Sequence, residues 1–333
     1  MTILLSALVV ALYSLTTTSW HELVPAFRRR VAKVNDVSRA PPLVPLTIDG
    51  VQAGEVSPVV LEALRGYPEV FQIAPDGTSV SLALRLETAS FEERNAAVAK
   101  AAAGLRESGV IQKWRDEILA LTTGFDAPPV LLTERRFVPL LGGRGYGVAI
   151  NGWSVSPETG QEHLWVATRA SDKATWPGML DSMAAGALAA GQSPVEAAQA
   201  EAAEEAGVPA QLAASARAAG AVSYRGVDED PVLPKNDTFF VFDLELPWDF
   251  QPRPVDGEVE CFERMSVDAV AQCIAYGEAL EWTGKPSGGG TPSAFKPNIN
   301  LVVIDWLLRR GHVPPDAPGY LDLVTSLRHE HCR

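Results

Sequence analysis

One short segment, residues 186–208, constrains the fold of this chain most, because its residues mark both ends of a helix. Ser193 suits the N-cap position, Pro194 suits the first helical residue, and Glu196 completes a capping box. Gly207 suits the left-handed residue that follows a last helical turn. The segment therefore predicts a helix that begins after Ser193 and ends before Gly207.

One face of this predicted helix carries small side chains. At 3.6 residues per turn, the face is formed by Val195, Ala198, Ala202 and Ala206. Small side chains allow a helix backbone to approach its neighbour closely. We therefore expect this helix to pack tightly against a β-sheet.

A different face carries three carboxylates, Glu201, Glu204 and Glu205, at spacings of three and four residues. Like charges at these spacings repel, and the helix dipole disfavours an anion in the last turn by ~0.3–1 kcal/mol. No Lys or Arg lies between Asp181 and Arg217 to offset them. A bound divalent cation would remove the conflict, and carboxylate oxygens suit Mg²⁺. A solvated acidic face is the alternative, and the helix alone favours neither.

The length of 333 residues and the hydrophobic share of 47% allow two domains, each with its own core. A glycine-rich stretch at 141–145 marks the expected boundary. We predict an apolar segment at 1–21, a small α+β domain at 22–140 and a second domain at 141–333.

The expected elements follow from hydrophobic periodicity and turn residues. In the first domain we predict hairpins at 44–56 and 70–86 and helices at 57–64, 90–105 and 111–121. In the second we predict strands at 146–155, 162–169, 221–224 and 238–246 and further helices at 266–275 and 298–309.

Charge and cysteine content exclude some classes of function. A formal net charge of −13 does not suit a protein that grips nucleic acid through its phosphates, although local cations or a metal can still attract a small anion. The three cysteines are an odd number and form no CxxC pair. A disulfide framework or a zinc site is therefore not expected, and a reducing compartment such as the cytoplasm is.

The apolar run at residues 3–15 is short for a membrane span, which needs about 20 residues. No Lys or Arg precedes it, and Arg28, Arg29 and Arg30 follow it. Three interpretations stay open: an ordinary first helix or a misassigned start, a membrane anchor, and a targeting peptide. Contact with a membrane is expected only for the anchor.

The acidic helix resembles the Nudix box. That box reads G, five residues, E, seven residues, R-E, an aliphatic residue, any residue, E-E, any residue, G and an aliphatic residue. The residues in register with it are Gly186, Glu201, Ala202, Glu204, Glu205, Gly207 and Val208.

Two positions of the box depart from the family pattern. Gln192 stands where the first glutamate is expected, and Ala200 stands where the arginine is expected. In the family these two residues are held to form a structural salt bridge. Losing both partners together is milder than leaving one charge unpaired, so the departures indicate a changed scaffold.

The resemblance extends beyond the box to a Nudix subfamily with an extra N-terminal domain, DUF4743. The segments that carry it are 164–167, 173, 175–181, 243–247, 256–260 and 295–298. It implies an α/β/α sandwich with a mixed sheet, preceded by a small α+β domain. It also implies a small-molecule diphosphate as substrate, with hydrolysis of thiamine diphosphate or its oxidised derivatives to the monophosphate and phosphate.

The resemblance further implies roles for individual residues. Glu201, Glu204 and Glu205 would hold Mg²⁺, with Mn²⁺ as the alternative, and the backbone carbonyl near Gly186 would be a further ligand. One carboxylate, Glu201 or the later Glu260, would accept the proton of the attacking water. Glu258 and Glu260 would face the same side of a regular strand, so either could reach the site, and the resemblance favours Glu260.

Four further side chains are expected to contact the substrate. Arg169 and Lys173 would contact the diphosphate, Trp176 would stack on a heterocycle, and Lys296 would reach the substrate. The ordinary alternatives are solvated surface cations, a core tryptophan and a loop lysine.

Two other functions compete. A diphosphate isomerase that resembles isopentenyl diphosphate isomerase would need a catalytic cysteine and additional metal-binding histidines, and neither Cys261, Cys273 nor the lone His163 meets this need. A binding module that kept the fold and lost turnover is motivated by Gln192 and Ala200. The oligomeric state is not predicted.

Overall fold

The computed structural model describes residues 19–85, 87–227, 234–277 and 293–329. The apolar run at 3–15 and the end of the second predicted hairpin, Leu86, lie outside these residues. No helix in the described part is both long and apolar enough to cross a membrane.

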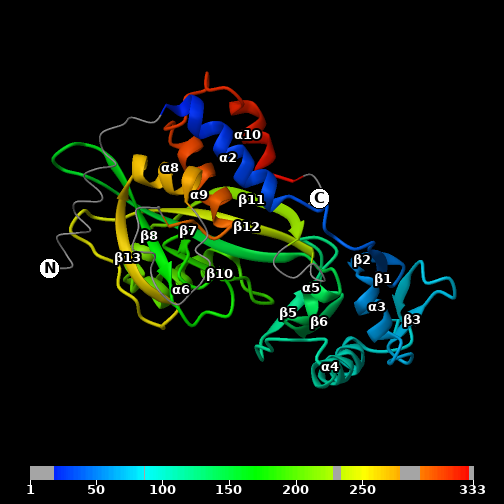
Figure 1. Ribbon diagram of the computed structural model, residues 1–333. Coiled ribbons are helices and arrows are strands. Elements are labelled where there is room, and N and C mark those ends of the chain that lie inside the picture. The colour runs from blue at the N-terminus through cyan, green and yellow to red at the C-terminus, as the bar shows by residue number, and fades with distance from the viewer. Residues whose placement is uncertain (1–18, 86, 228–233, 278–292, 330–333) are drawn as a thin grey trace.

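The N-terminal part forms a small α+β unit around its own hydrophobic core (Figure 1). Its four-stranded sheet has the order β2-β1-β4-β3, and a separate hairpin pairs β5 with β6. The elements are β1 (Val44–Ile48), β2 (Val51–Val56), α3 (Pro58–Leu64), β3 (Phe71–Ile73), β4 (Val80–Leu82), α4 (Phe91–Glu107), β5 (Ile118–Leu121), β6 (Leu131–Glu134) and α5 (Phe137–Leu140).

Local sequence explains most of this unit. Asp49 and Gly50 both take left-handed φ angles, 50° and 80°, in the turn between β1 and β2, as an Asp-Gly hairpin turn requires. The hydroxyl of Ser57 caps α3, and Ser90 forms a capping box at the start of α4. Both predicted hairpins and the helices at 57–64 and 90–105 are confirmed.

The helix predicted at 111–121 is wrong. Ile118–Leu121 is strand β5, paired with β6, and Lys113 and Asp116 have φ angles of 55° and 58°. An α-helix cannot contain such angles. Pairing with β6 therefore outweighs the modest helix propensity of this stretch.

The second unit is built on a mixed sheet of seven described strands in the order β11-β12-β7-β8-β13, with β10 on β7 and β9 on β8. β7 and β12 run parallel, and the other pairs are antiparallel. The strands are β7 (Gly145–Val155), β8 (Glu162–Arg169), β9 (Leu180–Asp181), β10 (Ala184–Ala187), β11 (Arg217–Val227), β12 (Pro234–Glu245) and β13 (Val259–Ser266).

Helices cover both faces of this sheet, which makes the predicted α/β/α sandwich (Figure 1). One face packs against α6, and the other packs against a group that includes a helix from the start of the chain and one from its end. The helices are α2 (Trp20–Val34), α6 (Pro194–Ala206), α7 (Ala210–Ala213), α8 (Val267–Tyr276), α9 (Ile299–Arg309) and α10 (Tyr320–Ser326).

Helix α6 has the predicted ends. Ser193 and Glu196 form the capping box, and Gly207 has a left-handed φ of 63°. Ala198, Ala202 and Ala206 are buried against the sheet, but Val195, predicted on the same face, is 48% exposed. Val195 lies in the first turn of α6, and the close approach to the sheet is made by the later, buried alanines.

The first unit contains a buried cation whose loss should destabilise the fold. The side chain of Arg94 is fully buried and contacts Asp49 at 2.8 Å, and it also donates to the carbonyls of Leu84 and Val130. We expect Arg94→Met to lower the free energy of unfolding by about 3 kcal/mol, because it breaks a buried pair. Urea denaturation measures the change.

The control is Arg65→Met, which removes an exposed ion pair with Glu62. Exposed pairs contribute less than about 1 kcal/mol. Equal losses in both variants would contradict the structural role of Arg94.

Candidate metal and diphosphate site

A close approach between α6 and β10 places the first glutamate of the site. A β-carbon at Gly186 would overlap the carboxylate of Glu201. Gly186 pairs with Val148 of β7, so the sheet holds it in place under the helix. The absence of a side chain at this one position therefore lets Glu201 lie against the sheet.

Glu205, one turn later, is a buried carboxylate that is 7% exposed. Its Oε2 accepts a hydrogen bond of 3.0 Å from the backbone N–H of Ala185. Burial raises the pKa of Glu205 to about 9, and the charges of nearby carboxylates, first Asp181 and then Glu201, add to the rise. A carboxyl group in this position loses its proton readily only when a cation lies beside it, because the cation stabilises the carboxylate.

Carboxylates from two parts of the chain meet here. Oxygens of Glu205, Asp256 and Glu258 lie within 4.8 Å of one another, as a shared metal ion would require. Burial raises the pKa of Glu201 to about 7, and the charges of Glu204, Glu258 and Asp256 raise it further, so Glu201 lies close to the same group. Glu204 is exposed at its edge.

Glu258, and not Glu260, lies in this cluster. Val259 pairs with Arg169 and Cys261 pairs with Thr168, so the strand pairing skips Glu260. Such a β-bulge inserts one residue and breaks the alternation of side chains. Both glutamates are exposed, but only Glu258, which precedes the strand, has an oxygen grouped with those of Glu205 and Asp256 among the described residues.

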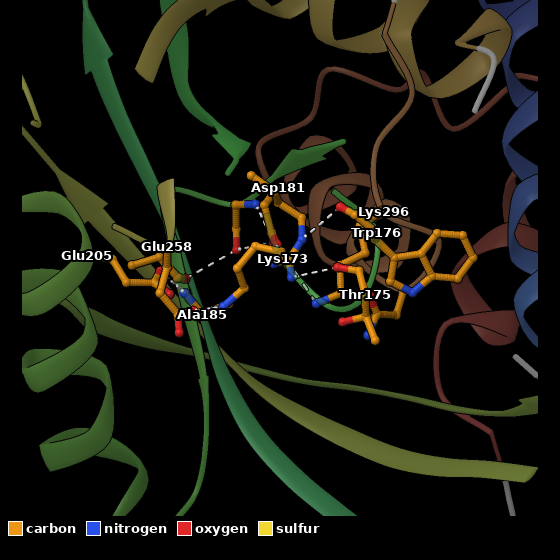
Figure 2. A network of polar contacts seen from close by, with 12 residues as sticks. Lys173, Thr175, Trp176, Asp181, Ala185, Glu205, Glu258 and Lys296 are labelled. Atoms are coloured by element: carbon orange, nitrogen blue, oxygen red, sulfur yellow. Dashed lines mark hydrogen bonds and ion pairs between the residues drawn. The ribbon is translucent and has the colours of Figure 1, made fainter. Parts of the chain in front are cut away.

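The predicted cation Lys173 contacts the cluster directly. Its Nζ lies 2.5 Å from Oε2 of Glu258 (Figure 2). Burial alone would raise the pKa of Glu258, but the hydrogen bond and positive charge of Lys173, with the charge of Arg169, lower it overall. Glu258 therefore stays ionised between a lysine and the acidic helix.

Two other predicted cations converge on Asp181, a buried carboxylate at the end of β9. Nη1 of Arg169 donates to Oδ2 of Asp181 at 2.8 Å, and Nζ of Lys296 lies 3.8 Å from the same oxygen. Burial lowers the pKa of Lys296, the attraction of Asp181 opposes this, and Arg169 lowers the pKa further. The three side chains form a buried charged group beside Glu205, whose pKa Asp181 helps to raise.

Arg169 also shapes the loop that follows β8. It donates from Nε to the carbonyl of Trp176 and from Nη2 to that of Thr175, both at 3.0 Å. Trp176 has a left-handed φ of 54°, a conformation that a bulky residue adopts only under constraint. In Figure 2 its indole points away from Glu205 and Glu258. Arg169 therefore holds the backbone of this loop at Thr175 and Trp176.

Two acidic residues of the site were not assigned a role from the sequence, Asp181 and Asp256. Both lie in segments that carry the family resemblance, 175–181 and 256–260. Asp256 follows β12 at a turn with Gly257, whose φ is 84°. That Asp-Gly signal predicts a turn but does not tell which neighbours the turn will meet.

The cluster fits a hard divalent cation. It offers only carboxylate oxygens, which suit Mg²⁺ and Mn²⁺. Among the residues that the structure describes, no Lys or Arg forms an ion pair with Glu201, Glu204 or Glu205. A buried carboxylate without a cationic partner is costly, and a bound cation would supply the missing charge.

Comparison with known proteins decides the family. The model of the NUDIX domain matches residues 145–283, and that of a domain of unknown function, DUF4743, matches residues 26–145. Nudix hydrolase 20 of Arabidopsis thaliana, described as chloroplastic, is 36% identical over 294 residues, which cover 87% of this chain and 74% of that protein. The chain belongs to the Nudix hydrolase family.

Two further relatives support this assignment. The Nudix hydrolase is 35% identical over 289 residues to the chloroplastic Nudix hydrolase 24 of Arabidopsis thaliana, covering 87% of this chain and 73% of the relative. It is 31% identical over 258 residues to the uncharacterized protein YJR142W of Saccharomyces cerevisiae. This match covers 73% of this chain and 70% of that protein. The protein is thus a Nudix pyrophosphohydrolase that acts on diphosphate anhydrides, and its substrate is a small molecule.

Of the two cysteines that the structure describes in this Nudix hydrolase, the buried one does not suit the chemistry of an isomerase. Cys273 is buried in the hydrophobic core between α8 and the sheet. Burial raises the pKa of its thiol to about 12, and Glu263 adds to the rise, so this thiol is inert. Cys261 is exposed beside the bulge of β13.

The contact between Gly186 and Glu201 generates a prediction. We expect Gly186→Ala to weaken Mn²⁺ binding by about tenfold or more, because the added methyl group displaces the Glu201 carboxylate. Isothermal titration calorimetry measures the affinity. The control is Gly124→Ala, where an added β-carbon meets nothing within 4 Å. Wild-type affinity in Gly186→Ala would show that Glu201 does not need this approach.

Metal addition should stabilise the protein through the same cluster. At a Mg²⁺ concentration about 100-fold above its dissociation constant, the wild type should gain about 2.7 kcal/mol of unfolding free energy. Glu205→Gln should lose most of this gain, because it removes the buried ligand charge. Thermal denaturation with Mg²⁺ and with a chelator tests this, and an equal gain in both proteins would contradict it.

Proposed function

We propose that this Nudix hydrolase uses Mg²⁺, or Mn²⁺ in its place, to cleave thiamine diphosphate or its oxidised derivatives to the monophosphate and phosphate. The observation that carries the metal-dependent part is the cluster of Glu205, Asp256 and Glu258, with buried Glu205 lacking a cationic partner among the described residues. The thiamine part rests on the sequence segments that resemble the subfamily, such as 175–181 and 295–298.

Glu201, Glu205, Asp256 and Glu258 would hold the metal, with Glu204 available at the exposed edge. A divalent cation in such a site supplies charge neutralisation of phosphate oxygens and a more acidic bound water. The reaction forms a bond from a water oxygen to phosphorus and breaks the bond from that phosphorus to the bridging oxygen.

The chain itself supplies the proton acceptor. Of the two carboxylates predicted for this step, Glu201 lies with the cluster and Glu260 is exposed on the β-bulge. We therefore propose that Glu201 would help to hold the metal with one carboxylate oxygen and accept the proton of the attacking water at the other. Gly186 contributes by leaving space for that carboxylate.

The surrounding cations mainly orient the carboxylates. Lys173 holds Glu258, and Arg169 and Lys296 hold Asp181 next to Glu205. Carboxylates held in this way keep their geometry before the metal and the substrate arrive, which lowers the cost of reorganisation. In this proposal Arg169 acts as a positioning residue for the loop with Trp176.

A binding module without turnover is the competing proposal, because Gln192 and Ala200 replace the family's salt bridge. The Oε1 of Gln192 accepts a weak hydrogen bond, 3.4 Å, from the N–H of Ala189. This hydrogen bond lies within the loop before α6 and does not connect position 192 to position 200. The two Arabidopsis relatives are described as chloroplastic, which favours a targeting peptide among the three interpretations of residues 3–15.

Phosphate release with Mg²⁺ tests both proposals. We expect wild-type protein to release phosphate from thiamine diphosphate and oxothiamine diphosphate faster than from nucleoside and sugar diphosphates. Glu205→Gln should lower kcat/KM by at least about 100-fold, because it removes a buried metal ligand. The matched control on the same helix is Glu196→Gln, since a capping box accepts Gln.

Each outcome has a meaning. No release from any diphosphate would favour the binding module. Release mainly from nucleoside diphosphates would retain the hydrolase and reject the thiamine substrate.

A further inference from the structure

The cations that the Nudix domain brings to its own site are already engaged with carboxylates. Lys173 pairs with Glu258 at 2.5 Å, Arg169 pairs with Asp181 at 2.8 Å, and Lys296 lies 3.8 Å from Asp181. A diphosphate that docks beside this acidic cluster brings further negative charge. Cations other than these three would lower the cost of bringing it there.

Lys113 of the N-terminal domain contacts the loop that carries Lys173. Its Nζ donates a hydrogen bond of 3.0 Å to the carbonyl of Ala174, the residue next to Lys173. The side chain is exposed, and within the described ranges it has no carboxylate partner. Lys113 therefore contacts the residue next to Lys173, and Lys173 in turn pairs with Glu258 of the acidic cluster.

The backbone around Lys113 is held in an unusual conformation. Lys113 and Asp116 both have left-handed φ angles, 55° and 58°, which cost a residue with a side chain about 1 kcal/mol or more. The opposite segment contains Trp176 with a φ of 54°. Constrained backbone thus occurs on both sides of the contact between the two domains, as at many ligand sites.

A second cation of the N-terminal domain, Arg135, follows the end of β6 and pairs with Glu117. Burial and neighbouring carboxylates raise the pKa of Glu201, and the positive charge of Arg135 opposes that rise. The pKa of Glu258 is lowered mainly by Lys173, with Arg169 and Arg135 adding to the effect. The guanidinium of Arg135 contacts Glu117 at 2.7 Å, but both side chains are largely exposed, at 39% and 51%. Such a pair contributes little, so Arg135 can turn to a phosphate at small cost.

The segment that carries these cations is anchored from inside. The buried carboxylate of Glu134 accepts hydrogen bonds from the backbone N–H groups of Arg115 and Arg136, at 2.8 and 2.5 Å. This carboxylate ties the strand end that precedes Arg135 to the loop that follows Lys113. The segments that carry the two cations are therefore connected at one edge of the domain.

We propose that the N-terminal domain completes the diphosphate site, with Lys113 and Arg135 binding phosphate oxygens at the open side of the acidic cluster. The proposal rests on the proposed function of that cluster. It gives the DUF4743 domain a role in binding the charged part of the substrate. Lys113 acts in addition as a link that holds the loop of Lys173 against the N-terminal domain.

The test measures binding of methylenediphosphonate with Mg²⁺ by isothermal titration calorimetry. This compound carries the charges of a diphosphate and cannot be hydrolysed at its bridge. We expect Lys113→Gln and Arg135→Gln each to raise Kd by about fivefold, as loss of one solvent-screened ionic contact does. The double variant should show a rise of about 25-fold, since the sites are separate.

Two controls separate binding from folding. Lys100→Gln removes an exposed cation of α4 in the same domain, and it should leave Kd within about twofold. Lys113→Arg keeps the charge and a donor, and it should bind like the wild type. Thermal denaturation confirms that each variant is folded.

A rise of less than about threefold in the double variant, or an equal rise in Lys100→Gln, overturns the proposal. The probe also distinguishes this failure from that of the proposed function. If the wild type hydrolyses no diphosphate but the double variant loses affinity, the cationic edge stands and the proposed hydrolysis falls.

Discussion

The whole site depends on one buried carboxylate. Glu205 is removed from water, receives a single described hydrogen bond from the backbone of Ala185, and lies among other acids. Taken alone, such a group would destabilise the fold unless it were protonated. The remaining features of the Nudix domain limit this cost: Lys173 neutralises Glu258, and Asp181 is held between Arg169 and Lys296. Among the described residues, the carboxylates of the acidic helix and Asp256 have no ion pair with a Lys or Arg, and their charge is left to a ligand.

Close packing makes this arrangement possible. The alanines of α6, such as Ala198 and Ala202, bring the helix near the sheet, and Gly186 removes the side chain that would otherwise collide with Glu201. Acidic side chains that would be solvated on a more distant helix are thereby pressed against β10. The site is therefore a consequence of helix-to-sheet distance as much as of the acidic residues themselves.

The features that could be predicted from the sequence depend on near neighbours. Ser193, Glu196 and Gly207 set the ends of α6 through contacts within a few residues, and Asp49-Gly50 sets a hairpin in the same way. The features that could not be predicted depend on partners far along the chain. Residues 111–121 form no helix because β6 pairs with β5.

The same division holds within the site. Glu201 and Glu205 were expected there because a local motif contains them, and the structure places both near Asp256 and Glu258. The bulge that exposes Glu260 arises from the pairing of β13 with β8, and no local pattern marks it. Likewise, the sequence shows Arg169 and Lys296 as available cations, although Asp181 engages both only after folding.

The packing of α2 has a consequence for how the molecule is made. This helix comes before the strands of the small N-terminal α+β unit in the chain. It nevertheless covers the sheet of the Nudix domain together with α8, α9 and α10. During synthesis, its apolar residues Phe27 and Val31 leave the ribosome long before the strands that will shield them. They must wait in a partly folded chain, where such surfaces attract chaperones or other nascent chains. A fragment that starts at β7 would meet the reverse problem, with a sheet surface left uncovered in the absence of α2.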